Sequence, residues 1–241
     1  RHIVTKRLFD HERCYFFQGT DGRIIFAIPY EQDFTLIGTT DQDHQGPAKG
    51  AHCTDAERDY LIDFANKYFK KPVTIDDVVW SFSGVRPLYN DGAASATAAT
   101  SEYVMSLESN GAPLLNVFGG KITTHRRLAE HALEKLAPFF PKATADWTAR
   151  VPLPGGDFPH GDVARLTREL RTAHDFLTPA WAARLIRAYG SEAAILLKGA
   201  KSAADLGQDC GATLTETEVR WLMTHEFART AEDVVWRRTK L

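Results

Sequence analysis

Segments that favour β-strands are confined to the first part of this chain of 241 residues, whereas its last part consists almost entirely of segments that favour α-helices. Aromatic and β-branched runs dominate the part before Pro138, whereas the part after a proline- and glycine-rich stretch at 151–156 is almost entirely of helical pattern. This order favours an α+β unit followed by a separate helical domain. We therefore predict an α+β domain over residues 1–140 and an all-α domain over residues 141–241.

The strand-type segments of the first part lie at residues 14–18, 23–30, 34–40, 103–108 and 114–118, with a further extended segment at 77–89. Ile3 and Val4 already have strand character, so we expect the sequence to start inside a larger protein. Thr54, followed three residues later by Glu57, predicts a capping box and a helix that runs to about Phe69. Further helices are predicted at 122–137, 162–173, 179–189, 215–228 and 230–239.

Composition excludes several classes of function. The 29 basic and 31 acidic side chains give a net charge of -2, which argues against a dedicated nucleic-acid binder. The three cysteines are odd in number and widely spaced, and the histidines show no metal-ligand spacing, so neither a disulfide framework nor a metal site is expected. No apolar run approaches the roughly 18 to 20 residues that a membrane-spanning helix needs.

The most informative local pattern is a predicted buried strand that ends in Gly119 and Gly120 and continues through Lys121 into a helix. Paired glycines allow positive φ and close approach of a ligand to the backbone. The first N–H groups of a helix lack internal acceptors, so this terminus suits an anionic or carbonyl-rich ligand. Lys121 adds a positive charge, and Thr123 and Thr124 add hydroxyl donors. A plain strand-to-helix turn with a solvated lysine is the alternative.

Two further residues are candidates for ligand chemistry. Arg86 lies in an extended apolar segment, where a guanidinium is costly to bury unless an anion such as phosphate pairs with it. His2 could accept a proton from a hydroxyl at neutral pH. The alternatives are an arginine at a strand edge, paired with a neighbouring side chain, and a histidine at an exposed terminus. The chain has no G-x-G-x-x-G and no P-loop of its own.

In their order along the chain, these patterns resemble the FAD-dependent glycerol-3-phosphate dehydrogenases of bacteria and mitochondria. The resemblance covers essentially all of the chain and rests on residues 2–4, 37–41, 80–88, 118–124, 153–156, 189–191, 205–207 and 236–240. It implies a D-amino-acid-oxidase-like fold, in which a mostly antiparallel sheet with helices caps the substrate site and a helical domain follows. It also implies that the FAD-binding region precedes Arg1, so that this chain is the C-terminal part of the enzyme.

By the same resemblance, the reaction is oxidation of sn-glycerol 3-phosphate to dihydroxyacetone phosphate by hydride transfer to FAD. Arg86 and Lys121, together with Thr123, match positions that hold the phosphate and hydroxyls of the substrate, and His2 matches the proton acceptor. His2, Arg86 and Lys121 are thus the expected catalytic residues. The residues expected to meet the flavin are Gly119, Gly120, Lys121, Ile122 and Thr123.

The resemblance further implies that electrons pass to a quinone and that the enzyme is a cytoplasmic homodimer bound peripherally to the inner membrane. Two alternatives stay open from the sequence. One is a flavin-dependent glycerol-3-phosphate oxidase that produces peroxide. The other is a non-catalytic binding module, which the missing dinucleotide fingerprint favours for the chain taken alone.

Overall fold

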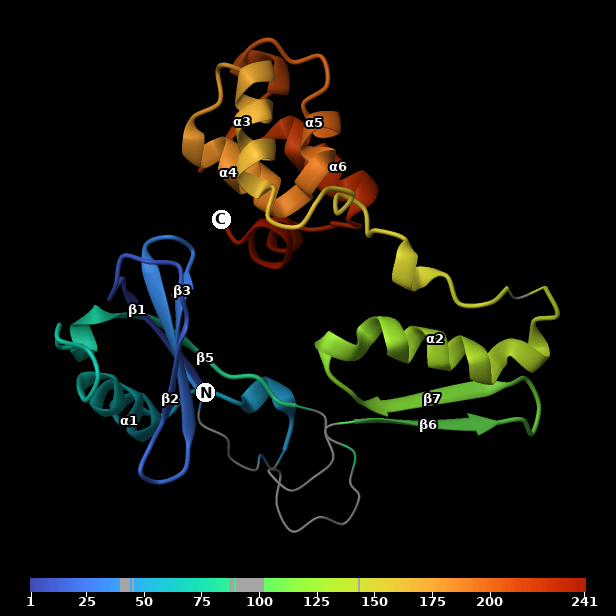
Figure 1. Cartoon of the computed structure of the whole chain (residues 1–241), viewed down its shortest axis with the longest axis horizontal. Coiled ribbons are helices and arrows are strands. Elements are labelled where there is room, and N and C mark those ends of the chain that lie inside the picture. The colour runs from blue at the N-terminus through green and yellow to red at the C-terminus, as the bar shows by residue number, and fades with distance from the viewer. Residues whose placement is uncertain (40–43, 45, 87–88, 90–101, 143) are drawn as a thin grey trace. The chain divides into compact units, whose positions relative to one another are not determined.

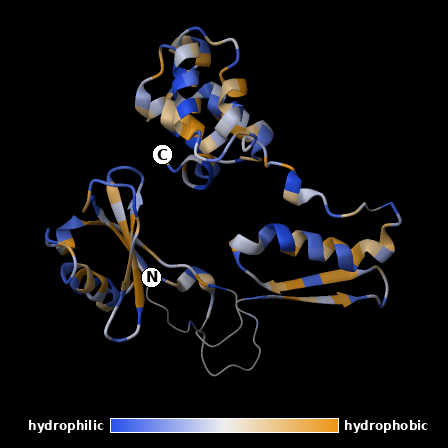
Figure 2. Cartoon of the chain, in the orientation of Figure 1, coloured by the Kyte–Doolittle hydropathy of each residue, from blue (hydrophilic) through white to orange (hydrophobic). Residues whose placement is uncertain are grey.

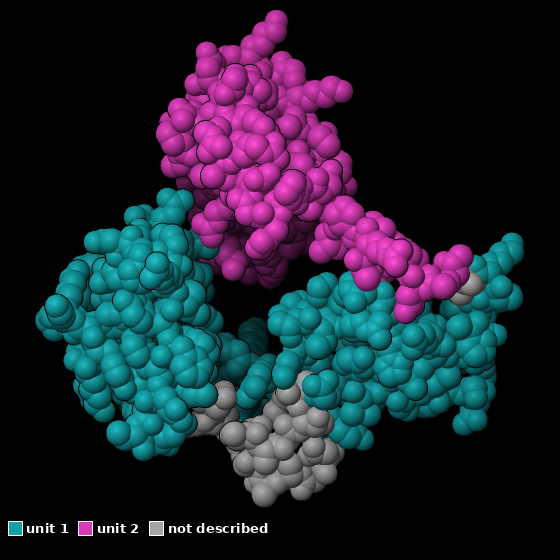
Figure 3. Space-filling view, in the orientation of Figure 1, with its two compact units in different colours: residues 1–143 teal, residues 144–241 magenta. Residues whose placement is uncertain are grey.

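The computed structural model describes residues 1–39, 44, 46–86, 89, 102–142 and 144–241. The chain divides into two compact units, residues 1–143 and residues 144–241 (Figure 3). The first unit contains antiparallel sheets with helices and the second is mainly helical, which confirms the predicted fold class. The expected loop over residues 90–101, together with Thr40, Asp41, Pro87 and Leu88, lies outside the described residues.

Figure 1 shows the elements of both units. Those of the first unit are β1 (His2–Lys6), β2 (Tyr15–Gln18), β3 (Ile24–Tyr30), β4 (Phe34–Gly38), α1 (Asp55–Asn66), β5 (Val78–Phe82), β6 (Tyr103–Glu108), β7 (Leu114–Gly119) and α2 (His125–Leu136). Those of the second are α3 (Val163–Ala173), α4 (Pro179–Tyr189), α5 (Ala193–Leu196), β8 (Asp209–Gly211), β9 (Leu214–Thr215), α6 (Glu216–His225) and a π-helical segment, Asp233–Thr239.

The main sheet of the first unit has the order β2-β3-β4-β1-β5, and every neighbouring pair is antiparallel. Because strand side chains alternate between faces, one face carries a continuous set of aliphatic residues that packs against α1. This core contains Ile3, Ile25, Ile37, Leu61 and Phe64. The opposite face carries aromatic side chains, several of which are exposed.

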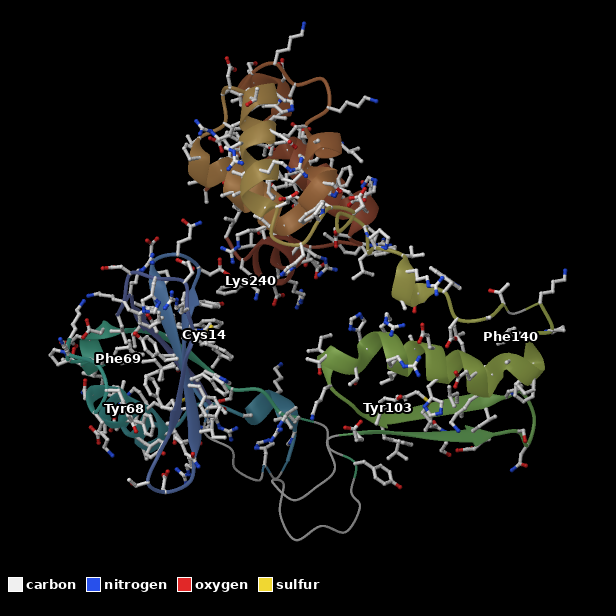
Figure 4. All side chains as sticks on the ribbon, in the orientation of Figure 1. Cys14, Tyr68, Phe69, Tyr103, Phe140 and Lys240 are labelled. Atoms are coloured by element: carbon white, nitrogen blue, oxygen red, sulfur yellow. The ribbon has the colours of Figure 1, made fainter. Side chains whose placement is uncertain are left out.

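Helix α1 begins and ends through side-chain hydrogen bonds to the backbone. The predicted capping box is present, because Glu57 N donates to Thr54 Oγ1 over 3.3 Å and Thr54 N donates to Glu57 Oε2 over 3.0 Å. The sequence predicted that the helix runs to about Phe69, but the helix ends at Asn66. The Asn66 amide exchanges two hydrogen bonds with the backbone of Val73, at 2.9 and 2.7 Å, and so fixes the turn that leaves the helix. Figure 4 labels Tyr68 and Phe69 just beyond this end.

The hairpin β6–β7 packs against α2 in the same unit. Both strands are drawn largely in hydrophobic colours in Figure 2, whereas hydrophilic and hydrophobic colours alternate along α2. Leu133 of this helix is 60% exposed. The buried residue of α2 is Glu130, whose carboxylate pairs with Arg126 at 2.5 Å and Arg127 at 2.7 Å. These ion pairs compensate its burial.

The helical unit has its own core, to which α3, α4, α5 and α6 contribute. A buried polar cluster joins α4 to α6, with Glu218 at its centre and only 1% exposed. Arg184 contacts both Glu218 carboxylate oxygens at 2.7 Å, and the Tyr189 hydroxyl donates to Oε1 at 2.8 Å. Burial, followed by the charge of Glu218, raises the pKa of Tyr189 far above its ordinary value, so the phenol keeps its proton and stays a donor.

Two elements of the helical unit differ from the sequence prediction. The hairpin β8–β9 was not predicted, because the two residues of its turn, Ala212 and Thr213, adopt positive φ although neither is a glycine. Gly211, just before them, has positive φ as well. Arg184 supports this turn by donating to the Thr213 carbonyl at 2.9 Å. The helix predicted over 230–239 is π-helical from Asp233, whose carboxylate accepts from the backbone N–H groups of Arg229 and Thr230.

Two glycine motifs far apart in the sequence are in direct backbone contact in this unit. Ser191 N donates to the Gly155 carbonyl over 3.0 Å. A Cβ added at Gly190 would lie 1.9 Å from Gly155 O, and one added at Gly155 would lie 2.2 Å from Tyr189 O. The motifs at 153–156 and 189–191 therefore attach the segment before α3 to the end of α4.

We expect Gly190→Ala to destabilise the helical unit by about 3 kcal/mol, because positive φ and a steric collision both oppose the new methyl group. Gly199→Ala is the matched control, since Gly199 also has positive φ but nothing lies within 4 Å of its added Cβ. That control should cost about 1 kcal/mol. Urea unfolding followed by far-ultraviolet circular dichroism measures both. If both variants lowered the free energy of unfolding equally, the contact with Gly155 would not contribute to stability.

Candidate active site

Strand β1 brings three of the sequence motifs to one end of the main sheet. It is antiparallel to both β4 and β5, so its first residue lies beside the last residues of these strands. In the observed register, His2 is opposite Gly38 on one side and opposite Phe82 on the other. The segments that continue toward Thr39 and Arg86 therefore leave the sheet next to His2.

The His2 imidazole is held between these two neighbours. The ring stacks on Phe82, with centroids 4.9 Å apart and an interplanar angle of 9°. On the other side, a Cβ added at Gly38 would lie 2.2 Å from His2 Cδ2. The ring thus occupies the space that any other residue at position 38 would fill. His2 is half-buried, in contrast to the exposed terminus that was the alternative from sequence.

A buried ion pair lies at the same end of the sheet. Arg1 Nε is 3.5 Å from Glu57 Oε2, and both side chains are about nine-tenths buried. Glu57 belongs to the capping box of α1, so this pair joins the start of β1 to the start of α1. The Arg1 backbone nitrogen lies 3.3 Å from Thr39 Oγ1. Burial raises the pKa of the neighbouring Cys53 thiol, and Glu57 adds to the effect, so Cys53 is not a thiolate at neutral pH.

Arg86 lies four residues beyond the end of β5 and is exposed. Tyr89, three residues further on, has its ring centroid 5.9 Å from that of Phe118 on β7. This contact connects the segment after β5 to the strand that leads into Gly119. Of the extended segment predicted over 77–89, the residues that the structure describes form a strand over Val78–Phe82.

The turn after β7 has the backbone that the paired glycines predict. Gly119 has φ of 72° and Gly120 has φ of 97°, both in the region that favours glycine. Gly120 also serves internal packing, since an added Cβ would lie 3.2 Å from Leu128 Cδ1 and 3.3 Å from Tyr103 Cβ. Tyr103 is labelled in Figure 4. One reason for this glycine is therefore the close approach of α2 to β6.

The segment that follows the glycines is largely exposed. Lys121, Ile122 and Thr123 are all exposed, and Ile122 is 85% exposed. The predicted helix starts with a 3₁₀ turn at Ile122–Thr124 before α2 begins at His125. The Thr124 hydroxyl donates to Lys121 O over 3.0 Å, so this donor is already used within the turn.

The structure brings some of the predicted site residues together. His2 and the segment leading to Arg86 meet at the end of the sheet, and Tyr89 links that segment to β7. Among the described residues, no hydrogen bond or ion pair joins Lys121 to His2 or Arg86. Sequence reasoning missed Gly38 and Phe82 as neighbours of His2. A glycine at the end of an otherwise apolar strand was the available signal for a close approach.

The residues present fit a flavin. Ser83 Oγ, one residue after Phe82, is buried and has no hydrogen-bond partner within the part of the chain that the structure describes. The exposed 3₁₀ turn after Gly120 starts with backbone N–H groups that its own geometry does not pair. A carbonyl-rich or anionic ring system matches such donors. Over the same described residues, no group of three or more histidine, cysteine or acidic side chains is arranged to hold a metal ion.

Comparison with known sequences identifies the class of protein. The profile of the FAD dependent oxidoreductase family matches residues 1–126, and that of the C-terminal domain of alpha-glycerophosphate oxidase matches residues 147–241. The chain belongs to the family of FAD-dependent oxidoreductases. This membership confirms the predicted dependence on FAD.

Individual relatives narrow the class. The chain is 43% identical over 241 residues to the aerobic glycerol-3-phosphate dehydrogenase of Escherichia coli, covering 99% of this chain and 48% of that protein. It is 42% identical over 240 residues to the D-erythritol 1-phosphate dehydrogenase of Brucella abortus, with the same coverage of each. The chain therefore spans about half the length of these relatives.

A solved structure that matches this chain is also a glycerol-3-phosphate dehydrogenase. The glycerol-3-phosphate dehydrogenase of Bacillus halodurans, complexed with FAD, matches with a TM-score of 0.73 and 27% identity. The match covers 99% of this chain and 47% of that one. The resemblance to glycerol-3-phosphate dehydrogenases that the sequence motifs indicated is thus confirmed at the level of sequence and of fold.

Proposed function

We propose that the full-length protein containing this chain oxidises sn-glycerol 3-phosphate to dihydroxyacetone phosphate. When bound, FAD would supply the acceptor for the hydride that leaves C2 of the substrate. The observation that carries the proposal is the pairing of β1 with β4 and β5, because it places a half-buried histidine beside the segment that leads to Arg86. The dehydrogenases among the relatives support the same reaction class.

Each predicted residue has a distinct chemical task in this proposal. His2 accepts the proton of the C2 hydroxyl, a role for which a neutral imidazole is suited. Arg86 binds the phosphate, since a guanidinium can donate two parallel hydrogen bonds to two phosphate oxygens. Lys121 supplies positive charge near the substrate and the flavin, and Gly119, Gly120, Ile122 and Thr123 present backbone donors to the cofactor.

We further propose that FAD, when bound, would pass its electrons to a quinone and that a homodimer acts at the cytoplasmic surface of the inner membrane. These proposals rest on the resemblance to quinone-linked dehydrogenases. None of the helices in the described part of the chain has the length and apolar character needed to cross a bilayer.

A second candidate substrate is D-erythritol 1-phosphate. The relative named for that activity is 42% identical to this chain, against 43% for the relative from Escherichia coli named for glycerol 3-phosphate. Both substrates are polyol phosphates, so the proposed roles of His2 and Arg86 apply to either. A peroxide-forming oxidase is a third candidate, because residues 147–241 match the profile of the C-terminal domain of alpha-glycerophosphate oxidase.

Steady-state assays of the full-length flavoprotein with a ubiquinone analogue test the proposal. We expect kcat/KM for glycerol 3-phosphate to exceed that for D-erythritol 1-phosphate by at least tenfold, since a pocket fitted to the shorter polyol excludes the longer one. Little peroxide should form in air. A preference for the tetritol phosphate would make erythritol phosphate the substrate, and stoichiometric peroxide would make the enzyme an oxidase.

Arg86→Ala should raise KM strongly and leave the flavin bound. Loss of two charge-assisted hydrogen bonds to phosphate costs about 3 kcal/mol, which corresponds to roughly a hundredfold rise in KM. Arg13→Ala, which removes another exposed arginine of the same unit, is the control. An unchanged KM in the Arg86 variant would remove this residue from the phosphate site.

His2→Ala should slow flavin reduction more than it weakens substrate binding. A positioned general base contributes about 10²- to 10⁴-fold to the rate of proton transfer. Anaerobic stopped-flow bleaching at saturating substrate gives the limiting rate and the dissociation constant separately. His11→Ala, at an exposed histidine that hydrogen-bonds Tyr15, is the matched control. Bleaching at the wild-type rate would count against a base at position 2.

A further inference from the structure

One cross-strand row runs over the whole main sheet. The register pairs Phe16 with Phe26, Phe26 with Gly38, Gly38 with His2, and His2 with Phe82. Each of the five strands contributes one residue to this row, and all five lie on the face opposite α1. Four of the five positions are rings, and the fifth, next to His2, has no side chain.

The glycine in this row determines where the imidazole can lie. An added Cβ at Gly38 would be 2.2 Å from His2 Cδ2 and 2.9 Å from His2 Cγ. No real Cβ tolerates such distances, so an alanine at position 38 would displace the ring. The collision involves ring atoms next to the His2 Cβ, not the far end of a long, flexible side chain. A small rotation at the end of the side chain therefore does not relieve the collision.

Phe82 acts on the opposite side of the imidazole. Its ring is nearly parallel to that of His2, at an interplanar angle of 9°, and it makes a second aromatic contact with Trp80, at a centroid distance of 4.9 Å. Stacking contacts only the face of an imidazole. It therefore fixes the plane of the ring while leaving the in-plane directions of its two nitrogens for hydrogen bonds.

We propose that Gly38 and Phe82 are positioning residues that set the plane of the His2 imidazole for proton transfer. The inference rests on the proposed role of His2 as proton acceptor. Neither residue needs to touch the substrate. A displacement of about 1 Å at a reacting group can cost roughly a hundredfold in rate. Gly38 and Phe82 therefore affect the rate of the chemical step rather than substrate binding.

The test uses stopped-flow reduction of the full-length flavoprotein by glycerol 3-phosphate. Phe82→Leu keeps an apolar side chain but removes the stacking plane, and Phe82→Tyr restores it. We expect the leucine variant to lower the limiting rate of flavin reduction by about tenfold, with the substrate dissociation constant changed by less than about threefold. The tyrosine variant should return to within about twofold of wild type.

Two further variants separate positioning from general damage to the sheet. Gly38→Ala should lower the limiting rate toward that of His2→Ala. Phe16→Leu, in the same row but on the edge strand and 60% exposed, should leave the rate unchanged. Flavin content and thermal unfolding are measured for each variant. If Gly38→Ala does not fold, the comparison of Phe82→Leu, Phe82→Tyr and Phe16→Leu decides alone.

The outcomes distinguish this inference from the proposed function. If His2→Ala slows reduction but Phe82→Leu and a folded Gly38→Ala reduce at the wild-type rate, the positioning role is wrong and the function stands. If Phe16→Leu slows reduction as much as Phe82→Leu, the effect belongs to the sheet as a whole and the inference is wrong. If His2→Ala itself reduces normally, both His2 as base and its positioning residues are wrong.

Discussion

The simultaneous antiparallel pairing of β1 with β4 and β5 is the constraint on which the rest of the first unit depends. The pairing is non-local, since β1 and β5 are separated by more than seventy residues. Its consequence is geometric, because the first residue of one strand must then lie beside the last residues of two others. Ile3 faces α1 and supplies core, whereas His2, the residue before it, faces the other way. One strand thus contributes both to stability and to the candidate site.

Several local features could be predicted from the sequence because the interactions that produce them are close along the chain. The capping box of Thr54 and Glu57 spans three residues and forms as expected. The strands of the main sheet and the hairpin β6–β7 follow from alternation and turn residues. The end of α1 was misplaced because Asn66 stops the helix by bonding Val73, seven residues away. The hairpin β8–β9 was missed because the two residues of its turn adopt positive φ although they are alanine and threonine.

The candidate site was predictable in its residue types but not in its geometry. Local patterns singled out His2, Arg86 and Lys121 one by one, and the family resemblance assigned them roles. That His2 lies between Gly38 and Phe82 follows from strand order, which no local pattern encodes. Gly120 shows that a motif which suggests a ligand can also have a structural cause. The paired glycines indicated a ligand, and the structure adds an internal reason for one of them, the close approach of Leu128 and Tyr103.

The backbone contact between Gly155 and Gly190 has a consequence for how the two units can be recombined. Residues 153–156 look like an interdomain linker, yet Gly155 accepts a hydrogen bond from Ser191 and leaves no space for a side chain at Gly190. The segment therefore belongs to the helical unit. A chimera that grafts this unit onto another protein must place its junction before Leu153, because a cut after Gly156 would separate the two halves of one packed interface.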